Sequence, residues 1–464
     1  MTDVERLRSE KRRAFMLKGN LIRVIMITAL PQVTTMLIDA LYNMADTFFV
    51  SQLGDAAIAA VGINDSLMMI IRALAMGFGV GASSFISRAL GAKRDEEASR
   101  AAVTTLYTAV GAMLLLAIGF SIFLRPLVTF LGATENVRPY SMDYARWILV
   151  SSPITAATVC ISQLLRSEGN TTYAMIGSVS GCVINVVLDP IFITTFGLGV
   201  AGAAIATGIS KVISLIFLLL PYIRRKCIIS LKLSNFSPTK AIYSEIVKMG
   251  VPTVLRVSMM SLSHIVINNV AGAFSDNALA AISVANKSMK FVASAVIGFG
   301  QGFQPIVGYS WGAKKYDRVL KSFWYTLLIG ALIGVVLGTL LIIFTDQVIM
   351  IFSDDAGMLE LGRILIRSQS IVLVPHVAAM IITSLFQALG KSVSAGVLGL
   401  SRQLISLIPA VLILSKLFGV IGLAYSQAAA DAFSFFLGVV IAVPVIRQLK
   451  RLERTQGLQD TLPL

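Results

Sequence analysis

Long apolar stretches separated by short polar segments dominate this chain. A helix that crosses a bilayer needs about 20 mostly apolar residues, and twelve stretches are long enough. Six lie in the first half, at 24–50, 57–86, 98–124, 139–165, 172–194 and 199–222. Six lie in the second half, at 245–273, 278–308, 319–345, 359–388, 392–415 and 419–445. The pattern predicts an all-α membrane protein with twelve transmembrane helices.

The two sets of six repeat each other at a spacing of 221 residues, the distance from Pro31 to Pro252. At the same spacing, Gly77-Phe78-Gly79 recurs as Gly298-Phe299-Gly300. A unit with an even number of spans returns the chain to its starting side. The repeat therefore predicts two parallel six-helix lobes related by a pseudo-two-fold axis along the membrane normal. Such repeats are typical of secondary transporters, in which substrate binds between the lobes, and not of enzymes.

Polar segments give the expected domain boundaries. Residues 1–20 form a cytoplasmic N-terminal segment, 21–223 the N-lobe and 243–449 the C-lobe. The stretch 224–242 is polar and basic and serves as a cytoplasmic inter-lobe linker, and 450–464 form a cytoplasmic tail. No removable signal peptide is expected, because the first twenty residues mix acids and bases without an apolar core.

Composition and charge agree with this assignment. Charged residues make up 14% of the chain, against about 25% in an ordinary soluble domain. The net charge of +15 gathers at the two termini, in the linker and in the loops on the same side of the bilayer. The other side offers only Arg125, Arg138, Arg363 and Lys416. By the positive-inside rule both termini are cytoplasmic, and this placement argues against a nucleic-acid partner.

Several motifs suggest nucleotide or metal chemistry but lack the required context. Gly77-x-Gly79-x-Gly81 lies inside an apolar helix, where small residues favour close helix packing instead of dinucleotide binding. Gly390-Lys391-Ser392 resembles the end of a phosphate-binding loop, but Leu385 stands where that motif needs glycine. The three cysteines and two histidines show no metal-binding spacing. We therefore expect no cofactor, and no metal other than a coupling ion.

Ionisable residues inside the predicted N-lobe spans are the strongest functional signal. Each costs roughly 2.5–3.5 kcal/mol at the bilayer centre and so needs a partner, a wet cavity or a function. Asp39 and Asp46 share one face of the first span, with Tyr42 and Asn43 between them on that face. The fifth span has Asn185 and Asp189, one turn apart and followed by Pro190, and the sixth has Thr207 and Lys211, also one turn apart. Their oxygens suit either a sodium ion or a proton relay.

The repeat provides an internal control for these residues. Asp39 and Asp46 correspond to Met260 and Ile267, and Asn43 corresponds to His264. The second lobe lacks these acids, which favours a coupling-ion site in the N-lobe alone. The alternative is that the buried charges only lock the helices together. Lys211 corresponds to Asp431 after a one-residue slip, and the two either bridge the lobes or face separate cavities. Lys211, His264, Asp431 and Asn43 are thus candidates for a cavity or gating role.

Three segments together resemble the multidrug and toxic compound extrusion (MATE) family, over essentially the whole chain from Ile22 to Arg447. They are Pro31 followed by Leu41-Tyr42-Asn43-Met44-Ala45-Asp46, the run 79–82 leading to Ser87-Arg88-Ala89-Leu90-Gly91-Ala92, and 185–190 with 202–207. The resemblance implies two six-helix lobes and export of amphipathic, often cationic compounds in exchange for Na⁺ or H⁺. It also implies a cation site at Asp46, Asn185, Asp189 and Thr207, with Tyr42 adjacent. Asp39 is a candidate from the residues alone.

The chain departs from some branches of that family, which place acids in the seventh and tenth spans. Between their terminal turns, those spans offer His264, Asn268, Asn269 and His376 but no carboxylate. This difference points to a bacterial branch that works through its N-lobe. We therefore expect a monomeric antiporter of the bacterial inner membrane whose partners are a small-molecule substrate and the lipid bilayer.

Two other functions remain open from the sequence. A flippase for lipid-linked sugars, or a dedicated metabolite exporter, would share the two-lobe plan. A flippase needs a cationic cavity, and only Lys211, Arg256, Lys287, Lys290 and Arg402 are placed even roughly to form one. A receptor or scaffold without transport activity is the second alternative, and a flux assay would decide it.

Overall fold

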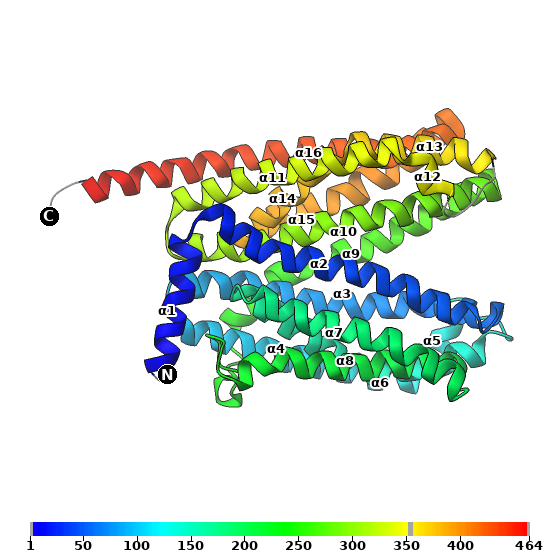
Figure 1. Ribbon diagram of the computed structural model, residues 1–464, viewed down its shortest axis with the longest axis horizontal. Helices are drawn as coiled ribbons and strands as arrows, with labels where there is room; N and C mark the ends of the chain where they lie inside the picture. The colour runs from blue at the N-terminus through cyan, green and yellow to red at the C-terminus, as the bar shows by residue number, and fades with distance from the viewer. Residues whose placement is uncertain (1–2, 351–355, 462–464) are drawn as a thin grey trace. The chain divides into compact units, whose positions relative to one another are not determined.

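The computed structural model describes residues 3–350 and 356–461, and over these ranges it contains helices and connecting loops but no strand (Figure 1). The first half forms α1 (Asp3–Lys18), α2 (Leu21–Ser51), α3 (Asp55–Gly91), α4 (Asp95–Ile122), α5 (Leu124–Phe130), α6 (Arg138–Ser167), α7 (Thr171–Pro190), the π-helical turn η1 (Ile191–Thr195) and α8 (Gly199–Ile223). The 3₁₀ turn η2 (Leu233–Asn235) lies in the linker. The second half forms α9 (Lys240–Phe274), α10 (Asp276–Gly312), α11 (Tyr316–Ile343), α12 (Thr345–Met350), α13 (Ala356–Ile371), α14 (Leu373–Leu389), α15 (Ser392–Leu400), the π-helical turn η3 (Ser401–Leu407) and α16 (Ile408–Thr461).

The described helices accommodate all twelve expected spans. Ten helical runs are long and apolar enough to cross a membrane, and the bent pair α13 and α14 makes an eleventh. The last run, Ser392–Gln456, has 65 residues and changes direction at Gly419, whose φ of 60° and ψ of −141° are not helical. The two final expected spans lie on either side of that glycine. This is an all-α, multi-pass membrane protein with the expected two-lobe plan.

One expected span, 359–388, is bent by 50° between Ile371 and Leu373. Pro375 explains the break. It has no backbone N–H to donate to the carbonyl of Ile371, four residues earlier, so the helical hydrogen-bond ladder is interrupted there. Pro190 acts in the same way at the end of α7, where the helix gives way to η1.

Contacts divide the described chain into two compact units, which we call unit 1 and unit 2. Unit 1 comprises residues up to Met16 and Thr34–Val254, and unit 2 comprises Leu17–Val33 and Leu255 onward. The first part of α2 therefore packs within unit 2, and the first part of α9 packs within unit 1. The lobe boundaries expected from sequence, 21–223 and 243–449, remain a prediction.

Glycines on α3 allow the first part of α9 to pack closely within unit 1. A Cβ added to Gly77 would lie 2.5 Å from Val254 Cγ2, and one added to Gly81 would lie 2.4 Å from the carbonyl oxygen of Ile246. No real side chain fits at such distances. The close helix packing inferred from the Gly77-x-Gly79-x-Gly81 pattern is therefore present.

The repeat reproduces this packing in unit 2. Gly298 and Gly302 of α10 are the repeat partners of Gly77 and Gly81. A Cβ on Gly298 would meet the backbone of Val33 at 2.7 Å, and one on Gly302 would meet the Cα of Ala29 at 2.3 Å. In each unit, the first part of a proline-containing span thus packs against two glycines of a neighbouring helix. Small residues allow the same close packing between helices in membranes.

Candidate functional site

The face of α2 predicted to carry polar groups lies within unit 1. Tyr42 is buried, and its hydroxyl is hydrogen-bonded to the side chain of Thr207 on α8. Thr207 is buried as well. Five residues before it, a Cβ on Gly202 would lie 2.6 Å from the carbonyl oxygen of Phe192. The absence of a side chain at Gly202 lets α8 pack directly on η1, which fixes Thr207 beside the end of α7.

Asn185 and Asp189 occupy the last turn of α7, with exposed fractions of 2% and 0%. Asn185 Nδ2 donates a hydrogen bond to Asp189 Oδ1 at 3.2 Å. The other side-chain oxygens, Asn185 Oδ1 and Asp189 Oδ2, have no hydrogen-bond partner among the described residues. A buried oxygen without a donor is costly, so this pair presents two oxygens that a cation or a proton would satisfy.

Asp46 adds a second carboxylate to this pair. It interacts electrostatically with Asp189 and with Asp65 of α3. Within the described part of the chain, neither Asp46 nor Asp189 forms an ion pair with a lysine or arginine. We call Tyr42, Asp46, Asn185, Asp189 and Thr207 the oxygen cluster. It combines negative charge with carboxylate, amide and hydroxyl oxygens and contains no thiol or imidazole.

A second group of charges in unit 1 lies around Asp39. Asp39 interacts electrostatically with Arg166 of α6 and with Lys211 of α8. Lys211 also interacts with Arg72 of α3, a like charge. Asn43, in contrast, donates its amide to the backbone carbonyl of Asp39 on its own helix. The structure therefore groups Asp39 with Lys211 and a set of cations.

Sequence reasoning missed Asp65, Arg72 and Arg166. Asp65 and Arg72 both lie in the second predicted span and are seven residues apart, the same spacing that identified Asp39 and Asp46. That spacing was the available signal. Arg166 is the second-last residue of α6 and lies just beyond the predicted span 139–165, where a charge is not unusual.

Among the described residues, the buried acid of unit 2, Asp431, has charged partners, unlike the acids of the oxygen cluster. Arg402 of η3 bonds both carboxylate oxygens of Asp431 on α16, with Nη2 to Oδ2 at 3.2 Å. His376 Nδ1 lies 2.9 Å from Asp431 Oδ1. Asp431 thus has its charge partners within its own unit. His264 is exposed on α9 and interacts electrostatically with Arg402 and Lys290.

A further buried acid, Glu168, lies outside the spans in the short loop between α6 and α7. The backbone N–H of Ile228 in the linker donates to Glu168 Oε2 at 2.7 Å. Next to it, Asn170 Oδ1 accepts a hydrogen bond from Arg12 of α1. Burial raises the pKa of Glu168 to about 7, although the hydrogen bond from Ile228 and the nearby charge of Arg12 oppose the shift. This loop joins α1, the linker and two spans of unit 1.

Comparison with known proteins supports the repeat and the fold. The sequence profile of the MatE family matches residues 31–191 and again 252–412, two copies whose starts are the repeat partners Pro31 and Pro252. The chain is 25% identical over 433 residues to the multidrug export protein MepA of Staphylococcus haemolyticus, covering 93% of this chain and 95% of that protein.

Solved structures agree over the same length. A crystal structure of MATE in complex with MaL6 matches with a TM-score of 0.90 and 27% identity, covering 94% of this chain and 99% of that one. The outward-facing conformation of a multidrug resistance MATE family transporter of the MOP superfamily matches with a TM-score of 0.87 and 28% identity, covering 94% and 98%. The resemblance drawn from the quoted residues is confirmed, and the chain belongs to the MatE family of transporters, the multidrug and toxic compound extrusion proteins.

Proposed function

We propose that this protein is a secondary-active multidrug efflux antiporter of the bacterial inner membrane, with both termini in the cytoplasm. It exports amphipathic, cationic compounds in exchange for H⁺ or Na⁺ by alternating access. The full-length likeness to a multidrug export protein supports the substrate class. The distribution of basic residues along the chain supports the orientation.

The oxygen cluster is the proposed site of the coupling ion. Asp46 and Asp189 supply the negative charge, while Asn185, Thr207 and Tyr42 supply neutral oxygens. The single observation that carries this proposal is the pair of buried oxygens, Asn185 Oδ1 and Asp189 Oδ2, that lack donors. Carboxylate, amide and hydroxyl oxygens are hard ligands suited to Na⁺, and the same carboxylates can take up a proton because two neighbouring acids do not both stay ionised cheaply.

Ion binding would act on export through the three helices that supply the site. Two mutually repelling carboxylates on α2 and α7 are drawn together when a cation or proton neutralises them. Such a change alters the packing of α2 against α7 and α8 and lowers the affinity for substrate in the ion-bound state. Exchange of one monovalent ion for one monovalent cationic substrate moves no net charge, so the concentration gradient of the ion drives it. Each additional ion that enters per cycle adds about 2.3 kcal/mol per 100 mV of membrane potential.

The experiment that tests this function is a transport assay on purified protein in lipid vesicles. A fluorescent organic cation serves as substrate, and Na⁺ and H⁺ gradients are imposed separately at a clamped membrane potential. We expect one of the two gradients to drive uphill movement of the cation and its collapse to stop that movement. Passive movement that follows neither gradient would contradict antiport.

A further inference from the structure

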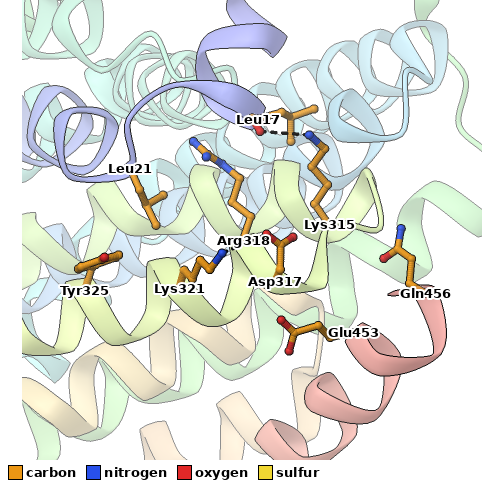
Figure 2. A pocket seen from close by; sticks show the side chains of 9 residues that line it. All are labelled: Leu17, Leu21, Lys315, Asp317, Arg318, Lys321, Tyr325, Glu453 and Gln456. Atoms are coloured by element: carbon orange, nitrogen blue, oxygen red, sulfur yellow. Dashed lines mark hydrogen bonds and ion pairs between the residues drawn. The ribbon is translucent and has the colours of Figure 1, made fainter. Parts of the chain in front are cut away.

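Unit 2 contains a cavity of about 590 Å³ at the end of its helices where basic residues gather (Figure 2). Residues of α1, α2, α11 and α16 line it, together with Lys315 just before α11. They are Leu17, Leu21, Lys315, Asp317, Arg318, Lys321, Tyr325, Glu453 and Gln456. The volume lies within the range of about 300–1,000 Å³ that is typical of small-molecule sites. The cavity is separate from the oxygen cluster, which lies in unit 1.

The basic residues of the cavity follow one face of the start of α11. Lys315, Arg318 and Lys321 are three residues apart, and Tyr325 follows four residues later, so they project to the same side. Lys315 Nζ donates to the carbonyl oxygen of Leu17 at 3.2 Å, and Arg318 Nη2 donates to that of Gly19 at 3.0 Å. These two contacts hold the cations against the α1–α2 junction.

The remaining lining sets the charge and polarity of the cavity. Lys321 Nζ lies 3.7 Å from Asp317 Oδ2, a long and half-exposed pair that leaves the ammonium accessible. Glu453 is the second acid, so three cations face two carboxylates. Figure 2 shows Leu21 and Tyr325 at one end of the cavity and Glu453 and Gln456 of α16 at the other. One end is thus apolar and aromatic, while the rest is charged.

The cavity lies beside the starts of two membrane-crossing stretches, where lipid headgroups are expected. The membrane-crossing stretches begin at Leu21 in α2 and at Tyr316 in α11, so the lining residues occupy the first turns of two spans. Tyrosine favours this interface because its ring is apolar and its hydroxyl is polar. Basic pockets at this level, between spans on the cytoplasmic side, attract the headgroups of anionic lipids.

We propose that this cavity binds the phosphate-bearing headgroup of an anionic phospholipid of the phosphatidylglycerol class. Lys315, Arg318 and Lys321 contact the phosphate, and the acyl chains leave past Leu21 and Tyr325. Glu453 opposes binding by its charge and limits the affinity. Binding at this point stabilises the α1–α2 junction, because the same two cations already hold its carbonyl oxygens.

The test measures thermal unfolding of the full-length protein in neutral detergent with added dioleoylphosphatidylglycerol, dioleoylphosphatidylcholine or inorganic phosphate. A ligand of the native state raises the melting temperature according to its concentration relative to its dissociation constant. We expect phosphatidylglycerol to raise the melting temperature well above phosphatidylcholine, and inorganic phosphate to have little effect. An equal effect of inorganic phosphate would contradict a lipid site.

Charge-removing variants distinguish lipid binding in the cavity from a general effect of surface charge. Lys315→Gln, Arg318→Gln and Lys321→Gln combined should weaken phosphatidylglycerol binding by about a hundredfold, since each near-surface base contributes about fivefold. The matched control removes three exposed bases of α16 that do not line the cavity, through Lys450→Gln, Arg451→Gln and Arg454→Gln. The control should keep the lipid preference, and equal loss in both triple variants would contradict the proposal.

Two single variants keep the test decisive if the triple variant folds poorly. Lys321→Gln leaves both carbonyl contacts intact and should weaken binding by about fivefold. Glu453→Gln removes the opposing carboxylate and should strengthen it. Weaker phosphatidylglycerol binding after Glu453→Gln would overturn the assignment of an anionic ligand.

Discussion

Arg402 bonds both carboxylate oxygens of Asp431, so the one buried acid described in the second-lobe spans is already neutralised by a side chain of its own unit. Asp189 in unit 1 is also buried, and among the described residues its side chain accepts a hydrogen bond from the amide of Asn185 and from no lysine or arginine. The two lobes therefore differ: one has an acid with a charged partner, and the other has acids without an ion-pair partner among the described residues. This difference is the physical basis for placing the coupling ion in the N-lobe alone.

The Arg402–Asp431 pair should behave as a buried ion pair in a double-mutant cycle. Arg402→Met leaves the Asp431 carboxylate with His376 alone, and we expect a loss of about 3 kcal/mol in unfolding free energy. The double variant Arg402→Met with Asp431→Asn removes both charges and should recover most of that loss. Chemical unfolding followed by tryptophan fluorescence measures both. Equal losses in the single and double variants would show that the two charges do not compensate each other.

Ion dependence of efflux should survive changes in unit 2. Asp431→Asn removes an acid whose charge Arg402 already balances. His264→Ala removes an exposed side chain from α9, whose one acid, Glu245, lies near the start of the helix and pairs with Arg88. Asp431→Asn leaves Arg402 without its partner and should lower stability, so efflux is compared at equal amounts of folded protein. At equal amounts, we expect both variants to keep gradient-driven efflux, with altered substrate preference as the main effect. The measurement is efflux from vesicles under the coupling gradient. If either variant loses ion dependence as fully as a variant at Asp46, a site confined to the N-lobe is wrong.

The glycine contacts of unit 1 should be sensitive to a single methyl group. In Gly81→Ala the new Cβ would lie 2.4 Å from the backbone carbonyl of Ile246, which has little room to move. Overpacking of this kind costs about 1–3 kcal/mol. Gly119→Ala on α4 is the matched control, because no atom lies within 4 Å of its added Cβ. Melting temperatures in detergent should fall for the first variant only.

The pKa of Glu168 predicts a pH-dependent stability. Its native pKa, raised by burial to about 7, exceeds the unfolded value of 4.5, so the native state holds the proton more tightly between these values. Stability from this group is therefore present below pH 4.5 and is lost as pH rises towards about 7. Glu168→Gln should remove that loss, because its oxygen still accepts from Ile228 but carries no charge.

The check compares the melting temperatures of the wild type and Glu168→Gln at pH 5 and pH 8. The variant should be the more stable of the two at pH 8, with the difference shrinking or disappearing at pH 5. Parallel curves for the two proteins would mean that Glu168 does not titrate in this range. Contributions from other titrating groups cancel in the comparison.

Sequence alone predicted the spans, the repeat and the five residues of the oxygen cluster, because hydropathy and a fixed register are local signals. Pro31 and Pro252 set the register, and Asn185 and Asp189 lie one helical turn apart on any regular helix. The bend at Pro375 was missed because some proline-containing helices, such as α6 with Pro153, remain continuous. Whether a proline breaks its helix depends on neighbouring packing.

The sequence also did not predict which side chains from other helices contact each buried charge. The one-residue slip that aligned Lys211 with Asp431 left open whether the two bridge the lobes or face separate cavities. It did not indicate that Asp431 pairs with Arg402 and His376 from η3 and α14. Nothing in the spacing of these three residues marks them as neighbours. Glu168 was missed because an acid in a loop is ordinarily solvated, and only the folded linker buries it.

The central claim is that Asp46 and Asp189 hold the coupling ion, and it is tested most directly by their asparagine variants in reconstituted vesicles. Asparagine keeps the size and hydrogen-bonding capacity of each side chain but removes the charge that neutralises the ion. We expect Asp46→Asn and Asp189→Asn each to fold and insert normally yet to abolish gradient-driven efflux, with Asn185→Ala and Thr207→Ala losing it in part. Efflux near the wild-type rate in both carboxylate variants would show that the coupling ion binds elsewhere.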